Sequence, residues 1–161
     1  MCIRDSPGTF DPPTFGHLDI IKRLSQMFDE VVVALLINGN KNPIFTLDER
    51  IEMIKSEVDD HNLKNVSIKT FDGLMVNFAK EEDAHIIARG LRGMADYEYE
   101  KNLARVNEAL YKGLETVYLL SNPDYSHISS SMVKEVASFE GDISSFVSKD
   151  VECKMKEKFN Y

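Results

Sequence analysis

The residues of this sequence best suited to chemistry lie near its start, where Pro7-Gly8-Thr9-Phe10-Asp11-Pro12 precedes Thr14-Phe15-Gly16-His17. A proline and glycine turn here leads into a predicted helix whose N-terminus lies near His17. Free backbone N–H groups and the helix dipole make such an end an anion site, and an imidazole there can donate to a phosphate oxygen. A lone histidine is more often a surface or capping residue, but the Thr-Phe-Gly-His context favours a phosphate site around His17.

Further candidates for phosphate binding carry a positive charge or a hydroxyl group and lie in later loops: Lys41, Arg89, Arg92, Ser129, Ser130 and Ser131. Forked guanidinium donors suit phosphate oxygens, and a lysine supplies a point charge. Serine hydroxyls and N–H groups at a helix start can also donate to phosphate oxygens. Taken in isolation, these residues could also be a solvated loop lysine, a basic turn and a helix cap.

Several familiar chemistries have no counterpart in the sequence. It contains neither G-x-x-x-x-G-K-[ST] nor G-x-G-x-x-G, so neither a P-loop kinase nor a dinucleotide oxidoreductase is indicated. A G-x-S-x-G nucleophile elbow is also missing. The four histidines lack metal-ligand spacing, and Cys2 and Cys153 cannot build a disulfide scaffold or a four-cysteine zinc site. The sequence therefore indicates none of the familiar phosphate loops, no nucleophile elbow and no zinc site.

The charge balance restricts the partners of the protein. Nineteen Lys and Arg against 27 Asp and Glu give a formal net charge of −8 over 161 residues. This acidic balance argues against non-specific binding to nucleic acid or to an anionic membrane, since both need a basic field. We find neither a membrane-length apolar run nor a signal pattern, and therefore expect a cytoplasmic protein. Any phosphate site must be built locally, against the overall charge.

Strands and helices alternate along the sequence. Short apolar runs predict strands at 31–37, 66–71, 85–88 and 116–120, with a first strand before the Pro7 turn. This order predicts an α/β fold, a Rossmann-like, doubly wound parallel five-stranded sheet in a single domain covering residues 1–161. Such sheets bind ligands beyond the carboxyl ends of their strands. The expected functional segments are therefore those that follow strands: 7–17, 38–43, 72–75, 89–92 and 121–131.

Apolar residues at helical spacing predict a helix after each strand. Thr46-Leu47-Asp48-Glu49 has the form of a capping box that begins the second helix. Ser131 is expected to cap a later helix, which Gly141 would close. The longest predicted helix is marked by four apolar residues: Tyr99, Leu103, Val106 and Leu110.

Thr14-x-Gly16-His17 resembles the (T/H)-x-G-H signature of the nucleotidyltransferase superfamily. The wider sequence resembles the bacterial phosphopantetheine adenylyltransferase family from about Pro7 to the C-terminus, with its motif blocks in the expected order. The blocks are Pro7-Gly8-Thr9-Phe10-Asp11-Pro12, Phe45-Thr46-Leu47-x-Glu49-Arg50, Arg89-Gly90-Leu91-Arg92, Asp96-Tyr97-Glu98-Tyr99-Glu100 and Ile128-Ser129-Ser130-Ser131-Met132-Val133-Lys134.

The resemblance implies a reaction of coenzyme A synthesis, in which AMP passes reversibly from ATP to 4′-phosphopantetheine and gives dephospho-coenzyme A and pyrophosphate. It implies Mg²⁺ as cofactor, bound through the substrate phosphates with no metal ligand from the protein, and no covalent enzyme intermediate. The acceptor phosphate attacks the α-phosphorus in line, so the protein positions the substrates and neutralises charge. In this scheme His17 stabilises the pentacoordinate transition state.

The resemblance also assigns residues to the two substrates. The ATP-binding residues it implies are Thr9, Phe10, His17, Gly90, Leu91, Arg92, Glu100, Tyr125, Ser126, His127, Ile128, Ser129, Ser130 and Ser131. The residues implied for phosphopantetheine are Thr9, Lys41, Met75 and Arg89. It further implies a homohexamer and feedback inhibition by coenzyme A.

The sequence departs from that family at its start, where Met1-Cys2-Ile3-Arg4-Asp5-Ser6 has one aliphatic residue after the initial Met and two adjacent charges. This composition predicts a poor central strand and an atypical or replaced N-terminus. Two other functions stay open: nucleotide transfer to a different acceptor, such as nicotinamide mononucleotide or glycerol phosphate, and a non-catalytic nucleotide-binding or assembly protein. An aminoacyl-tRNA synthetase is disfavoured, because no anticodon-binding extension and no basic surface is evident.

Overall fold

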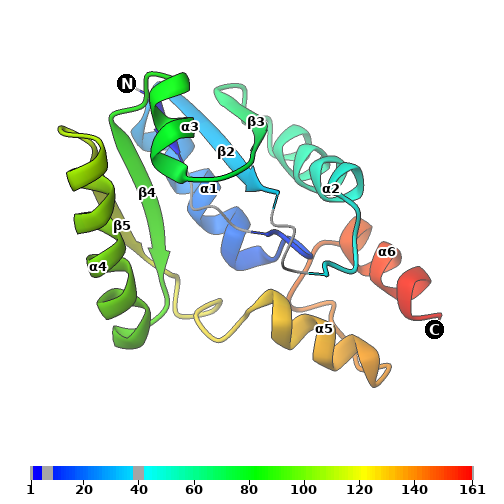
Figure 1. The fold of residues 1–161 in the computed structure, drawn as a ribbon. Helices are drawn as coiled ribbons and strands as arrows, with labels where there is room; N and C mark the ends of the chain where they lie inside the picture. The colour runs from blue at the N-terminus through cyan, green and yellow to red at the C-terminus, as the bar shows by residue number, and fades with distance from the viewer. Residues whose placement is uncertain (1, 5–8, 38–41, 161) are drawn as a thin grey trace.

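The computed structural model describes residues 2–4, 9–37 and 42–160. Strands and helices alternate through most of this chain, as Figure 1 shows. The strands are β1 (Cys2–Arg4), β2 (Glu30–Leu36), β3 (Val66–Phe71), β4 (Ile86–Leu91) and β5 (Glu115–Leu120). The helices are α1 (Phe15–Met27), α2 (Leu47–Asp60), α3 (Met75–Glu81), α4 (Met94–Leu110), α5 (Ser130–Ser138) and α6 (Lys149–Phe159).

All strand pairs are parallel, and the sheet runs in the order β3-β2-β1-β4-β5. The short β1 lies at the centre, with Ile3 opposite both Val31 of β2 and Ile86 of β4. The chain moves outward from β1 through β2 to β3 and then crosses to the other side for β4 and β5, so the order reverses between β1 and β4. The predicted α/β fold with a parallel sheet is confirmed, and the reversal is the place where such sheets bind ligands.

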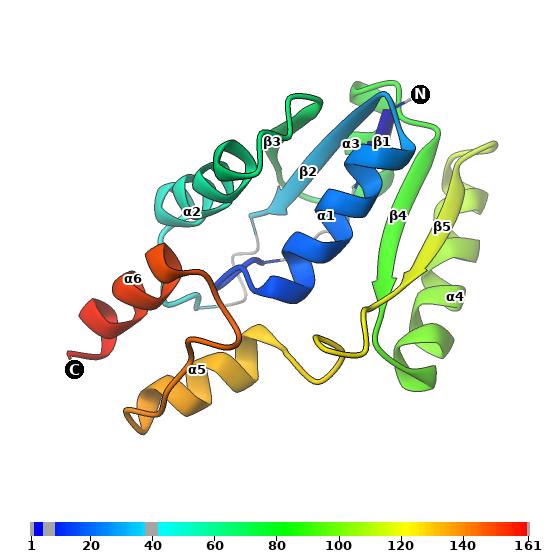
Figure 2. The same ribbon diagram turned by 180° about the vertical axis from the view of Figure 1, so that it is seen from behind.

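Helices cover both faces of the sheet. Helices α1 and α2 lie on one face and α3 and α4 on the other, as the two opposite views show (Figures 1 and 2). The apolar run of β2 serves both layers, because successive side chains of a strand point to opposite faces. Val33 packs with Ile21 of α1, and Val32 packs with Phe78 of α3. A continuously apolar strand is what a doubly covered parallel sheet requires.

The last two helices form a separate layer beyond one end of the sheet (Figure 2). Val133 of α5 and Val151 and Met155 of α6 are fully buried against Phe45 and against Met53 of α2. Their burial fixes the N-terminus of α5 at the carboxyl edge of the sheet. Over the residues that the structure describes, no helix is both long and apolar enough to cross a membrane.

Two predicted boundaries are wrong. The fourth strand does not end at residue 88 but continues to Leu91, because Arg89 and Gly90 pair in register with Tyr118 and Leu119 of β5. Backbone pairing in a ladder is indifferent to the charge of the side chain, so a polarity pattern cannot find this end.

The cap of α5 also differs from the prediction. Ser129, not Ser131, is the N-cap, and its hydroxyl accepts a hydrogen bond from the N–H of Met132. At the other end the left-handed residue is Glu140, with φ of 57°, while the N–H of Gly141 donates to the carbonyl of Val136. The capping box of α2 is confirmed, since Thr46 and Glu49 exchange both of its hydrogen bonds.

Candidate active site

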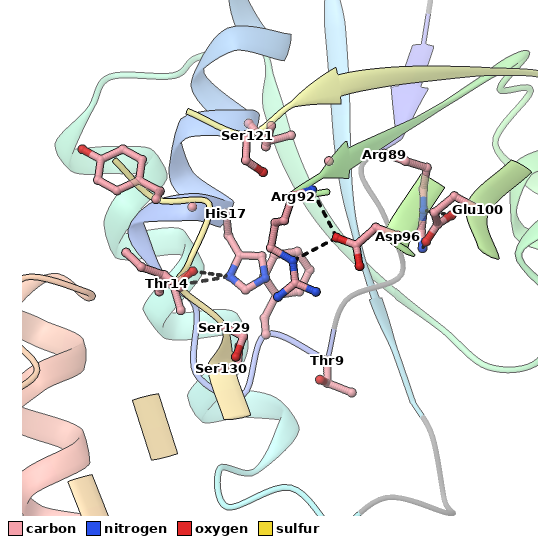
Figure 3. Close-up of a pocket in the computed structure, with 16 residues that line it drawn as sticks. Thr9, Thr14, His17, Arg89, Arg92, Asp96, Glu100, Ser121, Ser129 and Ser130 are labelled. Atoms are coloured by element: carbon pink, nitrogen blue, oxygen red, sulfur yellow. Dashed lines mark hydrogen bonds and ion pairs between the residues drawn. The ribbon is translucent and has the colours of Figure 1, made fainter. Parts of the chain in front are cut away.

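A cavity of about 320 Å³ opens at the reversal of the sheet, between the segment after β1 and the ends of β4 and β5. Many of the predicted site residues line it, although they come from distant parts of the chain: Thr9, Phe10, His17, Arg89, Gly90, Arg92, Glu100, Tyr125, Ile128, Ser129 and Ser130. Figure 3 shows the polar side chains of this nucleotide-sized cavity. We call it the polar cavity.

His17 stands in the first turn of α1 and is held by the cap of that helix. Its Nδ1 lies 3.0 Å from both the backbone nitrogen and the Oγ1 of Thr14. Because the backbone N–H of Thr14 can only donate, Nδ1 is the acceptor, and the ring proton of the neutral imidazole is assigned to Nε2. Burial, and to a lesser degree the positive charge of Arg92, lower the pKa of His17 to about 4. The side chain is therefore a neutral, oriented N–H donor at neutral pH.

Phe10 fixes the other side of the imidazole. The centroids of the two rings are 4.8 Å apart, and Phe10 is 1% exposed, in the core cluster with Val33 and Ile54. Its backbone takes a φ of 45°, which is unusual for a residue other than glycine. Such conformations persist only where surrounding packing imposes them, and they gather at functional sites. Phe10 thus acts as a rigid support for His17.

Arg89 reaches the cavity from β4 and is paired with Glu100 of α4. Its Nε donates to Glu100 Oε2 over 2.7 Å, and its Nη2 donates to Glu100 Oε1. Both side chains are nearly buried, at 12% and 11% exposure. The hydroxyl of Tyr118 donates to the carbonyl of Glu100, which anchors this turn of α4 to β5. A two-pronged pair of this kind holds the guanidinium in one orientation.

Arg92 is the more exposed cation of the site, at 47%. Its backbone N–H and its Nε both donate to Asp96 Oδ2, over 3.1 and 3.2 Å. Figure 3 shows this pair beside the imidazole of His17. An exposed pair of this type contributes little to stability, so its guanidinium is available to an incoming phosphate.

The N-terminus of α5 closes the cavity. Ser129 is engaged as its cap, and the hydroxyl of Ser130 donates to the carbonyl of Pro12 over 2.7 Å. Both serines line the cavity. The start of a helix offers backbone N–H groups that have no partner within the helix, and such groups can bind an anion.

A second cavity, of about 140 Å³, adjoins the first and has mostly apolar walls. Met75 lies here together with Phe71, Leu74 and Leu103, and Asn107 adds an amide. Arg89 and Glu100 line both this apolar cavity and the polar cavity. The buried ion pair is therefore the partition between the two.

Some predicted residues lie away from the walls of the polar cavity. Leu91 and Ser126 line a neighbouring, more open hollow, and Ser131 is exposed on α5. His127 is exposed and packs edge-on against Phe146, with centroids 6.2 Å apart. Lys41 lies outside the described residues. Their assignment to substrates stays a prediction.

Five further residues line the polar cavity although the sequence-based assignment gives them no substrate role: Thr14, Gly16, Ile20, Asp96 and Ser121. The sequence itself pointed to three of them through their motif or their place after a strand. Thr14 and Gly16 belong to the same motif as His17, and Ser121 directly follows β5 at the ligand-binding edge of the sheet. Ile20 lies one turn after His17 in an apolar series, where nothing distinguishes a wall of a cavity from core.

The polar cavity at the strand reversal, with an N–H donor at a helix start, suits a nucleotide, and the comparisons with known proteins identify the chain as a nucleotidyltransferase. Residues 6–136 match the family model described as cytidylyltransferase-like. The curated phosphopantetheine adenylyltransferase of Petrotoga mobilis is 49% identical over 160 residues, covering 98% of both chains. That of Heliobacterium modesticaldum is 47% identical over 159 residues, covering 99% of this chain and 94% of its own. The chain belongs to the phosphopantetheine adenylyltransferase family.

Two solved structures share the fold of this chain at low sequence identity. A putative nicotinate-nucleotide adenylyltransferase from Vibrio parahaemolyticus aligns with a TM-score of 0.63 at 19% identity, over 96% of this chain and 90% of its own. The Plasmodium falciparum nicotinic acid mononucleotide adenylyltransferase complexed with NaAD aligns with a TM-score of 0.67 at 16% identity, over 99% and 95%. At such identities the agreement concerns the fold alone.

Proposed function

We propose that this protein transfers AMP reversibly from ATP to 4′-phosphopantetheine, giving dephospho-coenzyme A and pyrophosphate. The observation that carries the proposal is the partition by Arg89 and Glu100 between a polar cavity and an apolar one. A nucleoside triphosphate suits the polar cavity. An acceptor with a phosphate at one end and a long, weakly polar arm suits the apolar cavity. The phosphate of such an acceptor would lie at the partition, beside the Arg89 guanidinium.

The chemistry follows from positioning. A phosphate oxygen of the acceptor attacks the α-phosphorus of ATP, the new P–O bond forms, and the bond to the β-phosphate breaks with release of pyrophosphate. Charge develops on the α-phosphate oxygens, and we expect the Nε2–H of His17 and the Arg92 guanidinium to donate hydrogen bonds to them. Donors fixed before the reaction stabilise this charge without reorganisation. The helix start at Ser129 and Ser130 receives the β- and γ-phosphates.

We propose that Mg²⁺ enters with the ATP. The two carboxylates of the polar cavity, Asp96 and Glu100, are engaged by Arg92 and Arg89, and the described residues contain no group of three or more potential metal ligands. These observations fit a cation carried by phosphate oxygens and water, which is how Mg²⁺ commonly binds. When bound, it neutralises charge on the triphosphate.

We also propose that the enzyme is a cytoplasmic homohexamer inhibited by coenzyme A. Tyr99, Val106 and Leu110 expose about half or more of their surface along α4, at 68%, 53% and 49%, and exposed apolar stripes commonly mark interfaces between copies. Coenzyme A carries both an adenylyl group and a pantetheine arm, so it matches both cavities at once. The cytoplasm supplies ATP, the proposed donor.

The test is pyrophosphate release from ATP and Mg²⁺, with and without 4′-phosphopantetheine, in the wild-type protein and in His17→Ala. Release that requires phosphopantetheine and collapses in the variant is the expected result. Nicotinamide mononucleotide and glycerol phosphate are tested as alternative acceptors in the same assay. Release with one of these instead, or none from a folded protein that binds ATP, would overturn the proposal.

A further inference from the structure

Asp11 lies just outside the polar cavity. It is buried, with 2% of its surface exposed, and its carboxylate accepts hydrogen bonds from three donors. Oδ1 accepts from the backbone N–H of Phe45 over 3.0 Å. Oδ2 accepts from the backbone N–H of Ile44 over 3.1 Å and from Nζ of Lys134 over 2.9 Å. A buried carboxylate with this many partners is costly to disturb, because each donor loses its acceptor at once.

Two of the segments that Asp11 joins carry candidate substrate contacts, the loop after β1 and helix α5. Asp11 directly follows Thr9 and Phe10, and Lys134 lies one helical turn after Ser130 on α5. Ile44 and Phe45 precede the cap of α2. Oδ2 of Asp11 therefore connects the motif loop to the helix whose N-terminus forms the anion site, across 123 residues of sequence.

Two further hydrogen bonds join the same segments. The hydroxyl of Ser130 donates to the carbonyl of Pro12 over 2.7 Å, and Nη1 of Arg50, on α2, donates to the carbonyl of Thr9 over 2.8 Å. The loop that carries Thr9 is thus bound to α5 on one side and to α2 on the other. The buried charge of Asp11, with Lys134 as its counter-ion, is the centre of this set of contacts.

We propose that Asp11 is a positioning residue for the adenylyl transfer, acting through Lys134 to hold the Thr9–His17 wall of the polar cavity against the N-terminus of α5. The inference rests on the proposed function and concerns the same site. In-line transfer needs the α-phosphate at His17 and the terminal phosphates at α5 in fixed relative positions. A displacement of about 1 Å between the two walls can lower the rate about 100-fold although both substrates still bind.

A competing explanation is that Lys134, with 30% of its side chain exposed, contacts the nucleotide phosphates itself. The two explanations differ in what Asp11 does. If Lys134 bound ATP directly, removing it would weaken ATP binding, and removing Asp11 would free the lysine for that task. If Asp11 and Lys134 act as a unit, either change disrupts the same geometry and the double change adds little.

The experiment compares Asp11→Asn, Lys134→Met, Lys134→Arg and the double variant Asp11→Asn with Lys134→Met. An asparagine at position 11 retains one oxygen, so it cannot accept from all three donors. Arginine at position 134 can still donate to Asp11. Lys154→Met is the matched control, because Lys154 forms an exposed ion pair with Glu52 over 3.4 Å between α6 and α2. The readouts are kcat and KM for both substrates, the Kd of ATP by calorimetry, and the midpoint of thermal unfolding.

We expect Asp11→Asn and Lys134→Met each to lower kcat about tenfold or more, with the Kd of ATP within about threefold of wild type. The double variant should match the worse single variant, Lys134→Arg should recover most of the activity, and the control should match wild type. Additive losses, a weakened ATP affinity with kcat retained in Lys134→Met, or unchanged kcat in both single variants would overturn the inference. If Asp11→Asn does not fold, the Lys134→Met and Lys134→Arg pair decides it. An inactive but folded wild type would instead overturn the proposed function and this inference with it.

Discussion

The two cavities of this protein share a wall, but different interactions hold their walls in place. The polar cavity is lined by three stretches of the chain, 9–20, 89–100 and 121–130. Its key groups are fixed by hydrogen bonds: His17 by Thr14, Arg89 by Glu100 and Ser130 by the Pro12 carbonyl. The apolar cavity lies among β3, α3 and α4, where packing of Phe71, Leu74 and Leu103 defines its shape.

The difference concerns how each cavity would contribute to the reaction. Oriented donors act most strongly on charge that develops in the transition state, so defects in the polar cavity should appear in kcat. Apolar walls bind substrate and transition state alike, so defects there should appear in the KM of the acceptor. The following substitutions test whether the two cavities can be separated in this way.

The largest effect is expected for His17→Ala. Loss of a preorganised donor should lower kcat by roughly 10²–10³-fold, while ATP still binds. Turnover by pyrophosphate release and ATP affinity by calorimetry measure the two quantities. Unchanged turnover would remove His17 from the mechanism and with it the catalytic reading of the polar cavity.

A smaller loss of activity is expected for Arg89→Met, and it should involve both cavities because Arg89 lines both. The change leaves Glu100 nearly buried without its cationic partner and removes the proposed contact to the acceptor phosphate. Loss of one member of such a pair should lower kcat/KM for phosphopantetheine about 30-fold or more. Glu100→Gln is the companion variant, since it retains an acceptor for Arg89 and should lose less. An equal or larger loss in Glu100→Gln would mean that Glu100 does more than orient Arg89.

A substitution in the apolar cavity should affect the acceptor only. Leu103→Ala removes part of its wall and should raise the KM for phosphopantetheine about fivefold, corresponding to about 1 kcal/mol of lost apolar contact. The KM for ATP and kcat should stay near wild type. Arg105→Ala, at an exposed position of the same helix, is the control. A fall in kcat with unchanged KM in Leu103→Ala would show that the cavities are not separable.

The smallest expected effect is on the stability of the fold, through the titration of His17. The pKa of His17 is about 4 in the folded protein, below the ordinary histidine value of 6.5, so the folded state binds fewer protons than the unfolded chain between these pH values. The stabilisation is present above about pH 6.5 and is lost as the pH falls towards about 4. Thermal unfolding of wild type and His17→Ala across this range measures it. We expect the difference in midpoint between the two proteins to change with pH only in this window, and kcat above it to show no titration of His17.

The range of the interactions explains part of where the sequence-based predictions succeeded and failed. The capping box at Thr46 and Glu49 involves residues three apart, so local spacing was sufficient to find it. The end of β4 was misplaced because Arg89 belongs to the strand through its pairing with Tyr118, 29 positions later. The cap of α5 was misplaced by two residues among consecutive serines, which are equivalent by type.

The sequence alone determined the alternation of strands and helices, the motif around His17 and the family of the protein, because each depends on residue type and short spacing. Only the tertiary structure decided which loops meet. It placed β1 between β2 and β4, paired Arg89 with Glu100, and brought Lys134 to Asp11. These contacts depend on strand order and on the packing of α5 and α6, and such long-range choices leave no periodic signal in the chain. The boundary between the two cavities is therefore a property of the fold, although every residue that forms it can be read in the sequence.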